Sequence, residues 1–169
     1  MKWLLVGDPH AVRSELADMA VLRDQVLRLE KDEQVDYVVY LGDLYDNFGL
    51  KDLEVERFWR EAFAAHRREV IAIVGNHDRP GDRSSSANSL VAHRGKRTYI
   101  VERPTVIDRV GFIPYSFTGE GFIADANNEP EGVKFTKTLI CHQAVTGSKY
   151  DNGYPADGNR LVQAWAWFA

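Results

Sequence analysis

The stretch YVVYLGDLYD, residues 37–46, is an apolar run that ends in a glycine followed by two aspartates. Consecutive apolar residues without alternation are typical of a strand buried on both faces of a parallel sheet. The same pattern occurs at residues 3–8, WLLVGD, and at residues 70–76, VIAIVGN. Apolar residues at helical spacing fill residues 12–29 and 55–65, between these runs. The alternation predicts parallel βαβ units and therefore an α/β fold.

The pattern changes after residue 78. Residues 79–97 are rich in Pro, Gly, Ser, Asn and Arg, so we expect a long exposed loop with a short helix near residues 89–93. Later strands follow one another without helices and are expected at residues 98–101, 105–107, 111–115 and 138–141, with a hairpin turn at 108–111. The simplest interpretation is one domain over residues 1–169, an α/β sandwich.

Composition limits the classes of function. The chain has 169 residues, with 21 Lys and Arg against 25 Asp and Glu, so its formal net charge is -4. This balance disfavours a protein that binds nucleic acid through a basic surface alone. Cys141 is the only cysteine, and we expect it to be a small core residue without a nucleophilic role. No apolar run reaches the roughly 18 residues of a membrane span, and Asp8 interrupts the N-terminal run, so we expect a cytoplasmic protein.

Side chains that bind metals follow four of the predicted strands. They are Asp8 and His10, then Asp43 and Asp46, then Asn76, His77 and Asp78, and finally His142. Asp8 and Asp43 lie 35 residues apart and Asp43 and Asn76 lie 33 apart, about one βαβ repeat each. Parallel strands would therefore bring these groups to the same sheet edge. One aspartate after a strand is as often a helix N-cap, but four such clusters favour a metal site for manganese, iron or zinc.

The two remaining histidines receive a structural interpretation. His66 follows the helical pattern and is expected at the protein surface. His93 lies in the polar segment after residue 79 and is expected to be solvated.

The motifs GDPH at residues 7–10, GDLYD at 42–46 and GNHD at 75–78, with the later His142, resemble the signature of the calcineurin-like metallophosphoesterase superfamily. They occur in the family's order and spacing. The resemblance implies a β-sandwich of two mixed sheets flanked by helices, and an enzyme that hydrolyses phosphoesters with a di-metal-activated water. It implies two divalent ions, and we expect manganese, with iron, zinc or nickel as alternatives.

The resemblance also implies which residues bind the metals. Asp8 and His10 would bind the first ion, Asp43 would bridge both ions, and Asn76 and His142 would bind the second.

Three further residues receive catalytic roles from the resemblance. His77 would contact the phosphate and help to protonate the leaving oxygen, while Asp46 and Asp78 would orient the metal ligands or His77. Arg79 and Arg83 belong to a locally basic stretch that would meet substrate phosphates. An ordinary solvated loop is the alternative interpretation of that stretch.

One family element is absent. The superfamily pattern ends in GHxH, which supplies one histidine to each metal, whereas His142 is the last histidine in this sequence. We therefore expect a C-terminally truncated domain with weak metal binding and low activity. Full occupancy of two metals in the purified protein would contradict this expectation.

Within the superfamily, the pattern is most similar to the SbcD-like DNA exonuclease branch, including stand-alone members of the phage type. The reasons are the continuation of GNHD as RPG and the CHQ around His142. In addition, NFG follows GDLYD, where protein phosphatases have GDxxDRG. The expected function is a DNA nuclease that acts with a partner ATPase or as a homodimer. The alternatives are a small-molecule or nucleotide phosphatase or phosphodiesterase, and a catalytically weakened binding module that lacks the last metal ligands.

Overall fold

The computed structural model describes residues 1–49, 52–80, 87–127, 138–144 and 149. The chain divides into two compact units, residues 1–101 and residues 102–169. The expectation of one domain stays a prediction. Among the helices in the described ranges, none has both the length and the apolar character that a membrane span requires.

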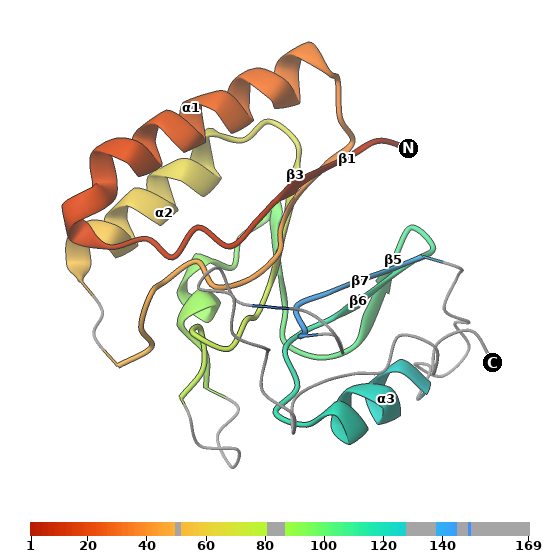
Figure 1. The fold of residues 1–169 in the computed structure, drawn as a ribbon. Coiled ribbons are helices and arrows are strands. Elements are labelled where there is room, and N and C mark those ends of the chain that lie inside the picture. The colour runs from red at the N-terminus through yellow and green to blue at the C-terminus, as the bar shows by residue number, and fades with distance from the viewer. Residues whose placement is uncertain (50–51, 81–86, 128–137, 145–148, 150–169) are drawn as a thin grey trace. The chain divides into compact units, whose positions relative to one another are not determined.

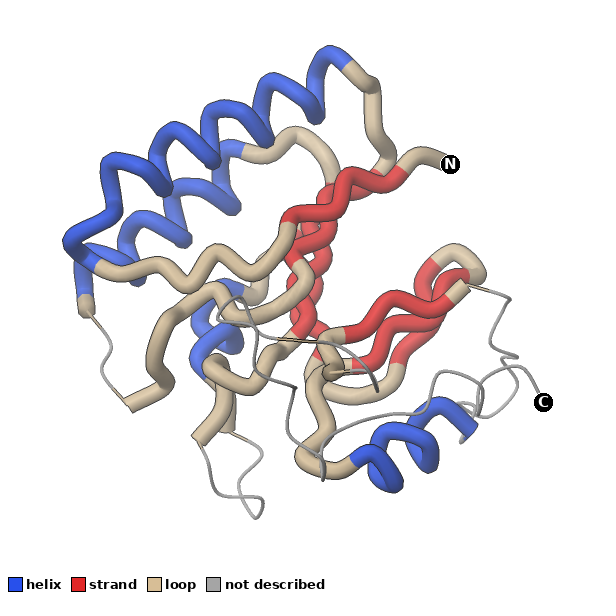
Figure 2. The backbone as a smooth tube through the Cα atoms, viewed as in Figure 1, coloured by secondary structure: helices blue, strands red, loops and turns tan. Residues whose placement is uncertain are grey.

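The first unit is built on a four-stranded parallel sheet in the order β1-β2-β3-β4. Figure 2 draws strands in red and helices in blue. The strands are β1 (Trp3–Val6), β2 (Tyr37–Tyr40), β3 (Glu69–Ile73) and β4 (Thr98–Val101). Leu4 lies opposite Val38, and Val38 lies opposite Val70. The predicted strands are confirmed here within one or two residues, and the carboxyl ends of β1, β2 and β3 lie at one edge of the sheet.

Two helices cover one face of this sheet. They are α1 (Leu16–Asp32), which follows the 3₁₀ turn η1 (Arg13–Glu15), and α2 (Leu53–Ala65), and they lie side by side in Figure 1. Trp59 and Ala62 of α2 pack in one core cluster with Val38 of β2. Burial of this amphipathic face is the main stabilising contribution to both helices. In the last turns of α1, Leu29 is 40% exposed whereas Glu30 is only 4% exposed.

The prediction that His66 and His93 are exposed is wrong. His66 is 1% exposed: its Nδ1 lies 2.8 Å from Glu30 Oε2, and its Nε2 lies 3.0 Å from the Tyr40 hydroxyl. His93 is buried in the predicted short helix η2 (Ser89–His93), with Nε2 2.6 Å from the Tyr45 hydroxyl. Each buried imidazole has at least one hydrogen-bond partner, which lowers the cost of burying it, and these partners lie far away in the sequence. The segment expected to be an exposed loop, residues 79–97, therefore contributes the buried side chains of η2 to the core.

The second unit contains a three-stranded sheet in the order β5-β6-β7. Here β5 (Thr105–Ile107) is antiparallel to β6 (Val110–Ile113), which is parallel to β7 (Leu139–Cys141). The predicted hairpin turn is confirmed, because Asp108 and Arg109 both have positive φ, as a two-residue hairpin of type I′ requires. Burial raises the pKa of the Cys141 thiol to about 11, so the thiol is protonated at neutral pH.

One helix of the second unit has no counterpart in the sequence prediction. This helix, α3 (Gly119–Asn127), packs Phe122 against Ile113 of β6. The Thr118 hydroxyl accepts a hydrogen bond from the Gly121 amide at 3.0 Å, which caps the first turn.

Candidate metal centre

The loops that follow β1 and β2 are joined by backbone hydrogen bonds. The His10 amide donates to the Asp43 carbonyl at 2.9 Å, and the Ala11 amide donates to the Leu44 carbonyl at 3.0 Å. His10 and Asp43 have positive φ angles of 43° and 49°, and Gly42 has a φ of 116°. The backbone hydrogen bonds between the two loops, with these left-handed residues, place His10 beside Asp43 at the sheet edge.

His10, Asp43 and His77 form the cluster. Their ligand atoms all lie within 4.8 Å of one another. His10 Nε2 is 3.5 Å from Asp43 Oδ2, and the two imidazole rings meet edge to face with centroids 4.7 Å apart. A nearly buried carboxylate beside the His10 imidazole offers ligand atoms that suit divalent manganese, iron or zinc, and the His77 imidazole lies next to them. The residues therefore fit a metal ion.

Asp43 is held from the β3 side as well. Its Oδ1 accepts a hydrogen bond from the His77 amide at 2.8 Å. A Cβ atom on Gly75 would lie 2.1 Å from the same oxygen, so only glycine fits at this position. The glycine of the GNHD motif thus lets the two loops approach closely enough to form the cluster.

The Asp78 carboxylate joins the same two loops through hydrogen bonds. Its Oδ2 accepts hydrogen bonds from the amides of Asp43 at 2.8 Å and Gly75 at 3.0 Å, and its Oδ1 lies 3.5 Å from the Tyr45 amide. The side chain is fully buried, and burial raises its pKa to about 6, while the backbone donors oppose this rise. These contacts link the loops after β2 and β3, and the orienting role of Asp78 stays a prediction.

One ring nitrogen of His77 forms a hydrogen bond with a backbone carbonyl group. Its Nδ1 lies 2.5 Å from the Asp46 carbonyl oxygen, which can only accept, so Nδ1 carries a proton. Nε2 is then the nitrogen that can face a metal or a phosphate. The Asp46 carboxylate is exposed, with Oδ1 3.8 Å from His10 Nδ1.

Three other residues are predicted metal ligands. Asp8 follows β1 and is exposed, and within the described part of the chain it is not a member of the cluster. Asn76 follows β3 and is half-buried. His142 follows β7 in the second unit, where its amide donates to the Ile113 carbonyl at 3.3 Å. The assignment of all three as metal ligands stays a prediction.

Of the two predicted substrate contacts, Arg79 is half-buried directly after GNHD, and Arg83 lies outside the described residues.

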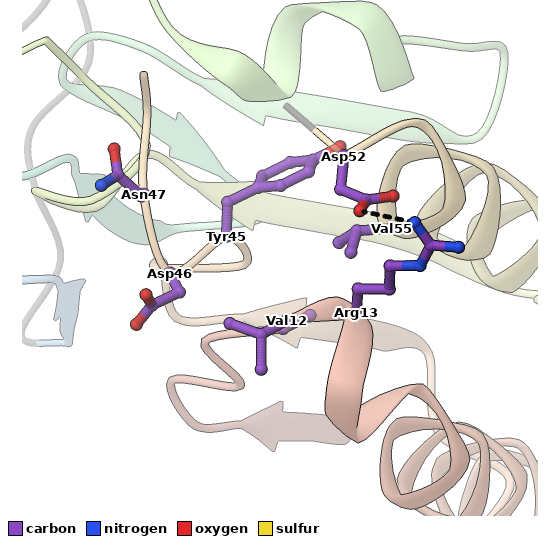
Figure 3. A pocket seen from close by; sticks show the side chains of 8 residues that line it. Val12, Arg13, Tyr45, Asp46, Asn47, Asp52 and Val55 are labelled. Atoms are coloured by element: carbon purple, nitrogen blue, oxygen red, sulfur yellow. Dashed lines mark ion pairs between the residues drawn. The ribbon is translucent and has the colours of Figure 1, made fainter. Parts of the chain in front are cut away.

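A cavity of about 200 Å³ opens beside Asp46 (Figure 3). In its wall, Arg13 forms ion pairs with Asp52 at 4.0 Å and with Glu54 at 2.9 Å. The guanidinium charge is therefore largely neutralised.

The sequence analysis did not assign Tyr45 and His93 to the site. Their hydrogen bond fixes the loop that carries Asp43 and Asp46, and their rings stack with centroids 6.0 Å apart. Burial raises the pKa of the Tyr45 hydroxyl, which therefore stays protonated. The aromatic residue inside GDLYD was the available signal, but its partner lies 48 residues away.

Residues 1–166 match the family described as calcineurin-like phosphoesterase. The chain belongs to this family. The prediction from the motifs is confirmed, and with it the fold class of two sheets with helices that the calcineurin-like phosphoesterases share.

Two known proteins are similar to this calcineurin-like phosphoesterase chain. The SbcD component of the nuclease SbcCD of Bacillus subtilis (strain 168) is 33% identical over 96 residues, which is 55% of this chain. The matched part spans 24% of the length of that curated relative. The crystal structure of Pseudomonas putida nuclease MPE is similar over 68% of this chain and 54% of that one, with 20% identity and a TM-score of 0.47.

Proposed function

We propose that this chain is a metal-dependent nuclease that hydrolyses phosphodiester bonds in DNA. The observation that carries the proposal is the cluster of His10, Asp43 and His77 at the carboxyl edge of a parallel sheet. The substrate class is supported by the similarity to a component of the nuclease SbcCD.

Two manganese ions are the proposed cofactor. Asp43 and His10 would hold them, together with Asp8, Asn76 and His142 as further ligands. Bound divalent ions activate water and neutralise the charge that develops on a phosphoryl group. Asp43 suits a bridging position because its carboxylate is nearly buried and oriented from both sides, by the His77 amide and by His10.

His77 is the proposed proton donor. The Asp46 carbonyl holds Nδ1, which orients the ring and leaves Nε2 to contact the phosphate and to release its proton to the leaving oxygen. Asp78 and Gly75 position these groups: Asp78 links the loops after β2 and β3, and Gly75 leaves room for Asp43.

The surroundings of the cluster suggest where the rest of the substrate binds. Arg79, next to the GNHD motif, and Arg83 are proposed phosphate contacts. The cavity beside Asp46 has a neutralised arginine and two carboxylates in its wall, so it suits an uncharged part of the substrate. We also propose a partner ATPase or a second copy of the chain, and a cytoplasmic location.

The test is cleavage of a linear DNA duplex and a single strand by the purified chain with manganese. We expect cleavage that a chelator abolishes and that Asp43→Asn abolishes. Asp24→Asn is the matched control, because Asp24 is an exposed carboxylate paired with Arg23 on α1. His77→Gln should lower kcat by about 10²–10⁴-fold, the usual contribution of a general acid, and should still bind manganese.

Other outcomes would contradict the proposal. Hydrolysis of nitrophenyl esters or nucleotides without any cleavage of DNA would favour the phosphatase alternative. Binding of DNA without hydrolysis of any ester would favour the binding module. Loss of manganese binding in His77→Gln would show that His77 is a ligand, against its role as proton donor.

A further inference from the structure

A second cavity, of about 560 Å³, opens at the other edge of the first sheet. Its wall includes Glu30, Lys31 and Gln34 from the end of α1, and Arg67 and Arg68 from the segment that leads into β3. Both helices return antiparallel to the strands, so their C-terminal ends lie at the amino-terminal edge of the sheet (Figure 1). The His10, Asp43 and His77 cluster lies at the carboxyl-terminal edge.

The cationic side chains in the wall of this cavity lack the ion pairs that several other cations of the same unit form. Lys31, Arg67 and Arg68 are exposed, and none of them forms an ion pair with any residue that the structure describes. Several other cations of the first unit are paired: Lys2 with Glu33, Arg13 with Glu54, Arg23 with Asp24, Arg57 with Glu61, and Arg60 with Glu56. The positive charge at the cavity is therefore available to an outside anion.

The one carboxylate in the cavity wall is committed to internal hydrogen bonds. Glu30 Oε1 accepts from the amides of Arg67 at 2.8 Å and Arg68 at 2.7 Å, and Oε2 faces His66 Nδ1 at 2.8 Å. Glu30 thus fixes the backbone of the two arginines without pairing with their guanidinium groups. A backbone held in this way reduces the entropy that an arginine loses when it binds an anion.

The positive charge continues along the sheet edge. Lys96 and Arg97 come directly before β4, they are exposed, and they form no ion pair with a described residue. The Val70 amide donates to the Arg97 carbonyl at 2.7 Å, which places this segment beside the start of β3. Adjacent strands lie about 4.8 Å apart. Exposed carboxylates are present in this region as well, namely Asp32 next to Lys31 at the end of α1 and Glu69 at the start of β3.

We propose that Lys31, Arg67, Arg68, Lys96 and Arg97, here called the basic edge, bind successive phosphate groups of a nucleic-acid strand away from the metal centre. Several unpaired cations across two neighbouring strands fit a repeating anion better than a single phosphate, and arginine suits phosphate oxygens. The identity of the polyanion rests on the proposed nuclease function. The chain as a whole is acidic, with a net charge of -4, so this local concentration of cations is not a consequence of composition.

The test is the salt dependence of binding to a fluorescent single-stranded oligonucleotide, measured by anisotropy with a chelator present so that no cleavage occurs. The variant R67Q/R68Q keeps both backbone amides for Glu30. We expect weaker binding and a shallower salt dependence. The slope of the logarithm of the binding constant against the logarithm of the salt concentration should decrease in magnitude by about 1.4, because each phosphate contact to a single strand contributes about 0.7. The variant K96Q/R97Q should act in the same direction and provides a second test if the first variant folds poorly.

The matched control is R57Q/R60Q, which removes the same charge from exposed, ion-paired arginines of α2. Its salt slope should equal that of the wild type. Equal slopes for all variants, or an equal decrease in the control, would overturn the proposal. Binding of inorganic phosphate without binding of the oligonucleotide would also overturn it. Binding through the basic edge without DNA cleavage in manganese would contradict the nuclease function and leave the basic edge supported.

Discussion

Gly75 determines how closely the loop after β3 approaches Asp43. A Cβ atom at this position would lie 2.1 Å from Asp43 Oδ1 and 2.5 Å from the Asp43 amide nitrogen. Gly75→Ala should therefore displace Asp43, lower the free energy of unfolding by about 1–3 kcal/mol, as overpacking does, and weaken manganese binding. Urea unfolding and a manganese titration would measure the two effects.

Gly7 provides the control for that substitution. It precedes Asp8 at the same sheet edge, but a Cβ atom there would meet nothing within 4 Å. Gly7→Ala should leave the stability and the manganese affinity close to those of the wild type. Equal effects of both substitutions would contradict the close approach inferred for Gly75.

Asp78 stabilises the site through hydrogen bonds from the backbone. Asp78→Asn keeps the size of the side chain but leaves one acceptor oxygen for the three backbone amides of Asp43, Gly75 and Tyr45. Its NH₂ group must then face at least one backbone N–H, donor against donor. We expect a loss of about 1–3 kcal/mol in the free energy of unfolding, measured in urea. Asp24→Asn, on the exposed face of α1, should change it by less than about 0.5 kcal/mol. Similar losses in both variants would contradict this account.

Among the secondary-structure elements, a buried polar chain links α1, the end of α2 and β2. His66 lies between Glu30 of α1 and Tyr40 of β2, and burial lowers the pKa of its imidazole below the ordinary 6.5 even though Glu30 opposes the shift. The folded state therefore binds fewer protons here than the unfolded state. The contribution to stability is complete above the ordinary pKa and is lost as the pH falls through the lowered value.

We therefore expect the free energy of unfolding to fall between about pH 8 and about pH 5.5 more steeply for the wild type than for His66→Gln. Urea titrations at several pH values would measure the difference. Parallel pH profiles for the two proteins would show that His66 does not titrate in this way.

The strands β1, β2 and β3 of the first sheet could be predicted from the sequence because each is a continuous apolar run that is followed by a glycine. The helix α3 could not be, since GEGFIADAN contains two glycines and has no apolar periodicity. The helix is stabilised by its cap at Thr118 and by the contact of Phe122 with Ile113. The contact with Ile113 is tertiary, so the local sequence does not reveal it.

Part of the candidate site could be predicted from the sequence, because its residues follow the predicted strands. His10, Asp43 and His77 follow parallel strands, and strand topology alone brings them to one edge. The burial of His66 and His93 depends on partners 36 and 48 residues away, and no local pattern specifies such contacts. The close approach at Gly75 likewise depends on Asp43, in another loop.

Across the first unit, charge is divided between the two edges of the sheet. The carboxyl-terminal edge holds Asp43, Asp46 and Asp78 beside two histidines, and the amino-terminal edge holds Arg67 and Arg68 without ion pairs among the described residues. We expect the carboxyl-terminal edge to attract divalent cations and the basic edge to attract phosphates. Both binding events should weaken with added salt, as electrostatic binding does.

The central claim is that Asp43, with His10, forms a metal centre at the carboxyl edge of the first sheet. Its most direct test is the electron paramagnetic resonance of free manganese titrated with the wild type, with Asp43→Asn and with Asp24→Asn. We predict that the wild type and Asp24→Asn bind manganese, and that Asp43→Asn loses at least about tenfold in affinity, as removal of a metal-site group does. The same manganese affinity and stoichiometry in all three proteins would contradict the claim.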